Sequence, residues 1–283
     1  RGGNARIEKG YNVLQGGAVG MVLYNPTLAD TETDNHWLPA VHLADGTDLL
    51  AFIDDHGPVS ASFTPGTKGT GKGDVIAAFS SRGPAGAVVK PDVAAPGVQI
   101  LAGQTPVLDA VDLGPEGEYY MAIAGTSMAG PHVAGAGILV KAAHPDWTPG
   151  QIKSALMTTA TTALVKEDET TPADPFDMGS GRIDIAAAVN AGLTLDESAQ
   201  DFFELTGGKD TIDLNIPSVN APTMPGREVT TRTFTNVGTG SATYQVSASA
   251  PAGSTITVSP SNFTVAAGQS KTVTITISST RHD

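Results

Sequence analysis

The sequence of 283 residues predicts an α/β chain that ends in a β-sandwich, and three observations lead to this fold class. Up to about residue 190, short apolar runs alternate with segments of helical periodicity, as in α/β folds. From about residue 200, apolar residues recur at every second position, as in strands with one buried face. A Gly-rich stretch at 65–73 predicts a flexible linker. We therefore expect an α/β unit at 1–64, a second α/β segment at 74–192 and a β-sandwich at 200–283.

The segment 1–64 combines two helix patterns with two strand patterns. The strand patterns are short apolar runs bounded by Gly, Asn or Pro, and Thr47 is expected to cap the second helix. Two strands and two helices barely close a core, so we expect this unit to be incomplete. The expected elements are helices at 5–14 and 47–54 and strands at 18–24 and 39–43.

The segment 74–192 contains one helix pattern without a polar face, at 125–143. Such a helix is expected to be buried on all sides. A second helix is expected to begin with Thr148 as its cap, Pro149 at its first position and Gln151 at its third, and to end near residue 160. The remaining expected elements are short strands at 75–79 and 93–95 and a helix at 182–190.

The segment 200–283 shows strand patterns separated by turns rich in Gly or Pro. Strands of this length at short intervals are typical of a β-sandwich. The alternating apolar positions are Tyr244 and Val246, then Ile256 and Val258, then Val273, Ile275 and Ile277.

Composition excludes several classes of function. The 16 basic and 29 acidic residues give a net charge of -13, which makes nucleic acid a poor partner. The absence of Cys excludes disulfides and thiol chemistry. No apolar run approaches the roughly 20 residues of a membrane helix, so no membrane span is expected. The chain does not begin with Met, and we expect it to be a piece of a longer protein.

The most informative stretch is Ala124–Gly135, which reads AGTSMAGPHVAG. Ser127 falls at the start of the helix predicted at 125–143, where backbone N–H groups are free and the helix dipole is positive. Both features would stabilise a developing oxyanion, and Gly125 leaves the approach to Ser127 open. An isolated serine here would be interpreted as a helix cap, but the residues around it favour a nucleophile.

This stretch resembles the nucleophile motif GTSMAxPHVAG of the subtilisin-like serine proteases, the subtilases. The segments 79–84 (FSSRGP) and 90–97 (KPDVAAPG) resemble sequences upstream of the serine in larger subtilases. Residues 1–64 resemble the later part of a protease-associated domain, and residues 200–283 resemble a fibronectin-III-like domain. The resemblance implies a subtilisin-like α/β portion at 74–192, with an incomplete parallel sheet around a buried helix.

The resemblance also implies roles for single residues. Ser127 would be the nucleophile, with its own N–H in the oxyanion hole, and Gly125 and Thr126 would border the substrate. His132 follows Ser127 by five residues, about 140° around one helix, so it is not the base; we expect a buried packing histidine. Asp92 is expected to be structural. No cofactor and no metal site are expected, and the acidic residues Glu167, Asp168, Glu169, Asp174 and Asp177 are interpreted as a solvated surface loop.

The rest of a subtilase triad is missing from the sequence. A serine nucleophile needs a base, and the base needs an orienting carboxylate. The family places these in a D-[ST]-G motif and an HGTxVAG motif, and neither occurs here. We therefore expect the Asp, the His and the oxyanion Asn upstream, with this chain beginning inside the inserted domain and inactive alone.

Three functions remain open at this stage. The first is a serine endopeptidase acting on proteins or peptides, of which this chain is the C-terminal portion. The second is a non-catalytic extracellular module that binds through the protease-associated and β-sandwich segments. The third is a degenerate protease, against which the intact motif at Ser127 argues. The family resemblance implies a secreted or cell-wall-associated protein, and unpaired sheet partners would allow the chain to self-associate.

Overall fold

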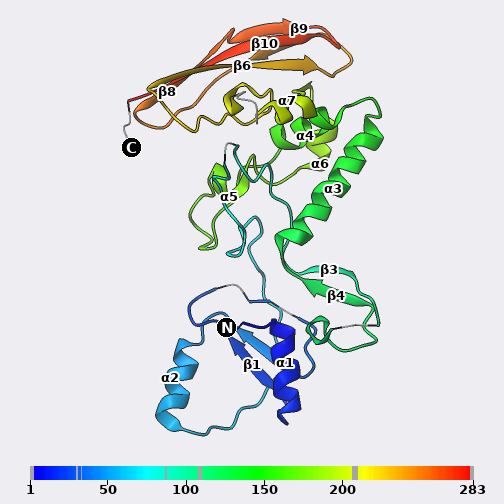
Figure 1. The fold of residues 1–283 in the computed structure, drawn as a ribbon, viewed down its shortest axis with the longest axis vertical. Helices are drawn as coiled ribbons and strands as arrows, with labels where there is room; N and C mark the ends of the chain where they lie inside the picture. The colour runs from blue at the N-terminus through cyan, green and yellow to red at the C-terminus, as the bar shows by residue number, and fades with distance from the viewer. Residues whose placement is uncertain are drawn as a thin grey trace. The chain divides into compact units, whose positions relative to one another are not determined.

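A computed structural model describes residues 3–29, 31–32, 34–86, 88–107, 110–205 and 210–280. The chain divides into two compact units. The first consists of Arg1–Ser80 and Pro96–Gly130, and the second of Ser81–Ala95 and Pro131–Asp283 (Figure 1).

The first unit contains the two helices and two strands predicted for residues 1–64. They are α1 (Arg6–Gln15), β1 (Met21–Tyr24), β2 (Ala40–Leu43) and α2 (Thr47–His56). The strands pair in parallel, and Met21, Leu23 and Leu38 form the buried cluster beside them. The predicted cap at Thr47 is wrong, because Gly46 is the N-cap and the Thr47 amide donates to the Asp45 carboxylate at 2.9 Å.

The first unit also contains β3 (Ile100–Gly103), a 3-10 turn (Val111–Leu113) and β4 (Tyr120–Ile123). β3 and β4 pair antiparallel, with Ile100 opposite Ile123, so the predicted parallel sheet does not form from these strands. The strands predicted at 75–79 and 93–95 are also wrong. The second of these segments lies between Pro91 and Pro96, and within it only Ala94 forms an isolated bridge, to Arg182.

The helix predicted at 125–143 is present as α3 (Thr126–Ala143), but the prediction that it is buried is wrong. Only Ala136 and Val140 are buried, whereas Ile138 is 70% exposed and Leu139 is 54% exposed. The buried pair is four residues apart on one stripe, which packs in a cluster with Trp147, Ala155, Leu156, Ile183 and Ala188. Described elements of the second unit therefore cover one stripe of α3 rather than its whole circumference.

Four shorter helices lie in the second unit: α4 (Pro149–Thr158), α5 (Pro175–Met178), α6 (Ile185–Val189) and α7 (Ala199–Glu204). The predicted start of α4 is confirmed. The Thr148 hydroxyl accepts from the Gln151 amide at 3.1 Å, and the Gln151 side chain accepts from the Thr148 amide at 3.0 Å. α6 is shorter than predicted because Asp184 caps it and Arg182 bridges Thr161 instead.

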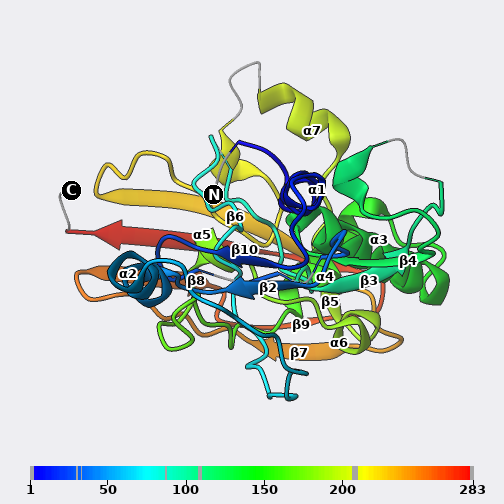
Figure 2. The same cartoon turned by 90° about the horizontal axis from the view of Figure 1, so that it is seen from below.

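The predicted strand patterns beyond residue 200 form two antiparallel sheets. One has the order β5-β6-β10-β8 and the other pairs β7 with β9. Figure 2 shows the long β6 and β10 side by side. In their antiparallel ladder, Ser270 lies opposite Thr235. Phe263, Val265 and Val273 are buried between the strands. The strands are β5 (Leu193–Thr194), β6 (Arg227–Asn236), β7 (Ala242–Gln245), β8 (Ser254–Ser259), β9 (Asn262–Val265) and β10 (Ser270–Ser279).

Arg232 of β6 is a buried cation surrounded by backbone oxygens. Its guanidinium donates to the carbonyls of Ile212, Ile216, Ser218 and Thr231 at 2.7–3.0 Å, and to the Thr230 hydroxyl at 3.0 Å. Burial lowers the pKa of Arg232, and the charges of Asp213 and Glu197 partly oppose this. These bonds tie the segment that precedes the sandwich, which contains the 3-10 turn Thr211–Asp213, to its central sheet.

We expect Arg232→Met to lower the free energy of unfolding by about 3 kcal/mol, since several buried carbonyls lose their donor at once. Arg227→Met, at the exposed start of the same strand, is the matched control and should change stability by less than about 0.5 kcal/mol. Urea unfolding measures both, and equal effects of the two substitutions would contradict a stabilising role of the buried Arg232 hydrogen bonds.

Candidate functional site

Ser127 lies in the first turn of α3 with its side chain exposed. The carbonyl of Gly125 accepts from the amides of Met128, at 2.9 Å, and Ala129, at 3.3 Å, and so begins the helix. The residues four positions before Thr126 and Ser127 belong to β4, so these two amides have no helical acceptor. The nucleophile predicted from the sequence therefore lies at a helix N-terminus, where donors and dipole favour negative charge.

Two features of the chain fix this turn from either side. Before it, β4 ends at Ile123, and the amide of Gly125 donates to the carbonyl of Gly97 at 2.7 Å. After it, Pro131 lies inside α3 and has no N–H, so the carbonyl of Ser127 receives no helical hydrogen bond. The backbone around Ser127 is thus held by its neighbours rather than by its own helical bonds.

Gly125 and Thr126, the predicted substrate-side residues, flank the serine directly. A Cβ built on Gly125 would lie 3.4 Å from the Met128 sulfur and 3.7 Å from the Ser127 amide nitrogen. Both distances are ordinary van der Waals contacts, so a methyl group at this position would lie beside the Ser127 amide without a clash. The Thr126 side chain is exposed.

Each described histidine outside α3 contacts residues other than Ser127, and none of these contacts makes it a base for Ser127. His36 lies beside Asp34, and His42 interacts with Asn25 and Glu32. His56 stacks on Phe52, and the His144 ring hydrogen-bonds the Val189 carbonyl. His282 lies outside the described residues.

The prediction that His132 is buried is wrong, because its side chain is exposed. It is four residues before Ala136, on the stripe that packs in the second unit. Within the same turn of α3, it is Val133 rather than His132 that packs against the cluster around Ala136 and Val140.

Asp92 is held between two cations of the second unit. Its carboxylate accepts from Lys90 at 2.5 Å and from Lys153 at 2.9 Å. Burial opposes the charged form, but the hydrogen bonds and charges of the two lysines outweigh it and lower the pKa of Asp92. Asp92 thus anchors its loop to α4 as a charged carboxylate.

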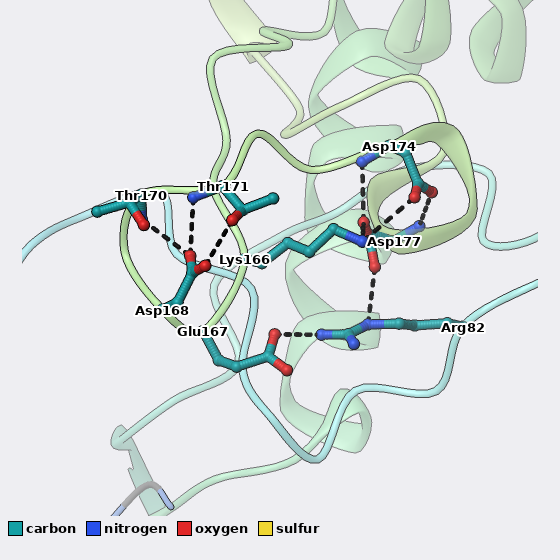
Figure 3. A network of polar contacts seen from close by, with 8 residues as sticks. All are labelled: Arg82, Lys166, Glu167, Asp168, Thr170, Thr171, Asp174 and Asp177. Atoms are coloured by element: carbon teal, nitrogen blue, oxygen red, sulfur yellow. Dashed lines mark hydrogen bonds and ion pairs between the residues drawn. The ribbon is translucent and has the colours of Figure 1, made fainter.

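Figure 3 shows two arrangements among the acidic residues at 167–177. One is the turn around Asp168, and the other joins Glu167, Asp174 and Asp177 to Arg82 and Lys166. Asp168 is exposed, and its pKa is lowered by the Thr171 hydroxyl and by the amides of Thr170 and Thr171, all of which donate to its carboxylate. Asp177 is buried, so the interpretation of a solvated loop is wrong for this residue. Within the described residues, no group of three or more His, Asp or Glu side chains is arranged to hold a metal ion.

Asp177 is buried because three donors converge on its carboxylate. The Asp174 amide donates at 2.8 Å, Arg82 Nε at 2.7 Å and Lys166 Nζ at 3.0 Å. Burial works against its charge, but these partners outweigh it and lower the pKa of Asp177. The network joins the loop at Arg82 to the start of α5, where the Asp174 side chain caps the helix.

Comparison with known sequences identifies the family. The profile of the Subtilase family matches residues 25–181, and that of a fibronectin type-III domain matches residues 213–283. The chain belongs to the subtilase family. Its fold is accordingly a subtilisin-like portion followed by a fibronectin-III-like domain.

Two curated relatives agree with this assignment, and their lengths show how much of a relative this chain covers. Subtilisin-like protease SBT1.6 of Arabidopsis thaliana is 35% identical over 98% of this chain and 42% of its own length. Subtilisin-like protease SBT1.3 of the same plant is 36% identical over 93% of this chain and 40% of its own length. Fervidolysin of Fervidobacterium pennivorans, a keratinolytic enzyme related to subtilisin, shares 30% identity over 35% of this chain and 15% of its own, with a TM-score of 0.28. The chain thus spans about 40% of the length of the curated relatives it matches.

No helix in the described part of the subtilase chain is both long enough and apolar enough to cross a membrane.

We expect Asp177→Asn to lower the free energy of unfolding by about 1–3 kcal/mol at pH 7, because Arg82 and Lys166 lose their shared counter-charge. The pKa of Asp177 is lowered on folding, so its contribution is present above the unfolded pKa of about 4 and is lost as pH falls through the folded value. The gap between wild type and variant should therefore narrow between pH 7 and pH 3.

Thermal unfolding at both pH values measures this gap. Asp146→Asn is the matched control for the change in charge, because Asp146 is exposed in the same unit and lies outside the contacts of Asp177. A gap for Asp177→Asn that is equally large at pH 3 and pH 7 would contradict the charge-based explanation.

Proposed function

We propose that this chain supplies the nucleophile segment of a serine endopeptidase, with Ser127 as the catalytic serine. The observation that carries the proposal is the exposed Ser127 in the first turn of α3, within the motif GTSMAGPHVAG. Membership of the subtilase family supports it. Gly125 and Thr126 would border the bound substrate, a protein or peptide.

The chemistry follows from this placement. The Ser127 oxygen attacks the carbonyl carbon of a peptide bond while a base takes its proton. The carbonyl oxygen becomes an oxyanion, which the Ser127 amide and the positive end of α3 stabilise. The C–N bond then breaks, the base returns its proton to the leaving amine, and water later releases the acyl group from Ser127 by the same steps.

The base is proposed to lie upstream, with its orienting Asp and the oxyanion Asn. The motifs in which subtilases carry the Asp and the His do not occur in this sequence. The relatives are more than twice as long as the stretch they share with this chain, which leaves room for these residues. The protease-associated origin of residues 1–64 is part of the same proposal, as is a secreted or cell-wall-associated location.

The alternative is a non-catalytic extracellular module that binds through residues 1–64 and the β-sandwich. The match to a fibronectin type-III domain at 213–283 favours it. The two functions differ in what they require of Ser127, since a binding module keeps its affinity when the serine is replaced. Loss of all function in Ser127→Ala would favour the endopeptidase.

We expect a fluorophosphonate probe to label Ser127 in the full-length protein, and to label this chain alone at least about 100-fold more slowly, because the proposed base lies upstream of it. Mass spectrometry of the labelled peptide measures both rates, and Ser127→Ala is the control for site. Rapid stoichiometric labelling of the chain alone would show that it contains a base.

Self-association of the chain alone is a further expectation, supported by the exposed Ile138 and Leu139 of α3. The double substitution Ile138→Ser and Leu139→Ser should shift the chain toward the monomer in sedimentation velocity. A wild-type chain that is monomeric at every concentration tested would contradict it.

A further inference from the structure

Gly97 makes a close backbone contact with the turn that carries Ser127. The carbonyl of Gly97 accepts from the Gly125 amide at 2.7 Å. Three residues after Gly97, at Ile100, the ladder between β3 and β4 begins. Gly97 precedes the serine by 30 positions and lies in the segment KPDVAAPG, which resembles a subtilase sequence upstream of the nucleophile.

The space at Gly97 is too small for any side chain. A Cβ built there would lie 2.8 Å from the carbonyl oxygen of Gly125, 3.2 Å from the Ala129 Cβ and 3.5 Å from the Ala129 amide nitrogen. The 2.8 Å distance to the Gly125 oxygen is shorter than real Cβ atoms show, and this oxygen belongs to the backbone, so it cannot move aside as a flexible side chain could. A methyl group at position 97 must therefore displace the Gly125 carbonyl or the Gly97 backbone itself.

The Gly125 carbonyl is the acceptor that begins α3, since Met128 and Ala129 both donate to it. Ser127 lies between this carbonyl and those donors. Displacement at Gly125 would therefore turn the Ser127 amide and side chain together, while residues beyond the first turn keep their packing. A shift of about 1 Å in a reacting group can cost on the order of 100-fold in rate.

We propose that Gly97 is a positioning residue for Ser127: its lack of a side chain and its carbonyl fix the Gly125 turn, and so the direction of the nucleophile and of its oxyanion donor. This inference rests on the proposed function. It assigns Gly97 to the geometry of the reacting serine, not to substrate contact.

The experiment compares Gly97→Ala with Gly103→Ala. Gly103 is the last residue of β3, its backbone needs no special conformation, and a Cβ there meets nothing within 4 Å. In the full-length protein we expect Gly97→Ala to lower kcat and the fluorophosphonate labelling rate by about 10–100-fold, with KM within about twofold. In the chain itself, hydrogen exchange of the Gly125 amide should accelerate at least about tenfold in Gly97→Ala, because its bond is lost. Gly103→Ala should leave all four quantities near wild type.

The outcomes separate the inference from the proposed function. Unchanged exchange at Gly125 in Gly97→Ala overturns the positioning contact, whatever the catalytic result. Faster exchange with wild-type kcat shows that the contact does not direct Ser127, and also overturns the inference. A fall in kcat that matches only a smaller folded fraction, measured by thermal unfolding, indicates a structural role and overturns it as well. A wild-type protein that does not react at Ser127 rejects the proposed function, and the inference falls with it.

Discussion

The carbonyl of Gly125 is the group on which the geometry of the candidate site depends. It accepts two amides from the first turn of α3 and lies directly against the backbone of Gly97. Helix initiation fixes several backbone angles for few hydrogen bonds, so the first turn is the part of a helix most dependent on outside support. Here the support comes from the end of β4 and from the segment before β3. The backbone of the turn that carries the exposed Ser127 is therefore held by contacts on its N-terminal side.

The local parts of this arrangement could be predicted from the sequence, because their causes are local. The capping residues of α4 are within four positions of one another, and Thr148 and Gln151 need only each other to form the box. The start of α3 at Ser127 was predicted from a contiguous run of residues. The alternating strands of the sandwich were predicted for the same reason, since a period of two shows within one strand.

The parts that could not be predicted depend on partners distant in sequence. The composition of α3 indicates a helix that avoids water on every side, yet burial also requires elements that cover it, and described residues cover only the Ala136–Val140 stripe. Asp177 resembles any other acidic residue of its loop until Arg82, 95 positions earlier, is placed against it. In the sequence, Gly97 is simply the glycine of a Pro-Gly pair, and its contact with the Gly125 turn is visible only in the structure. In each case the sequence defines the side chain but not its neighbour.

The second unit buries charge in two opposite ways, and the difference determines how each responds to pH. Asp177 is a buried anion held by two cations and an amide, so acid removes its charge and with it the reason for Arg82 and Lys166 to converge there. Arg232 is a buried cation held by neutral oxygens, and a guanidinium keeps its proton throughout the range in which proteins are folded. The link between the sandwich and the segment that precedes it therefore withstands acid, whereas the link between the Arg82 loop and α5 does not. Acid would therefore loosen the contact between the Arg82 loop and α5 before it loosens the contact that joins the sandwich to the segment before it.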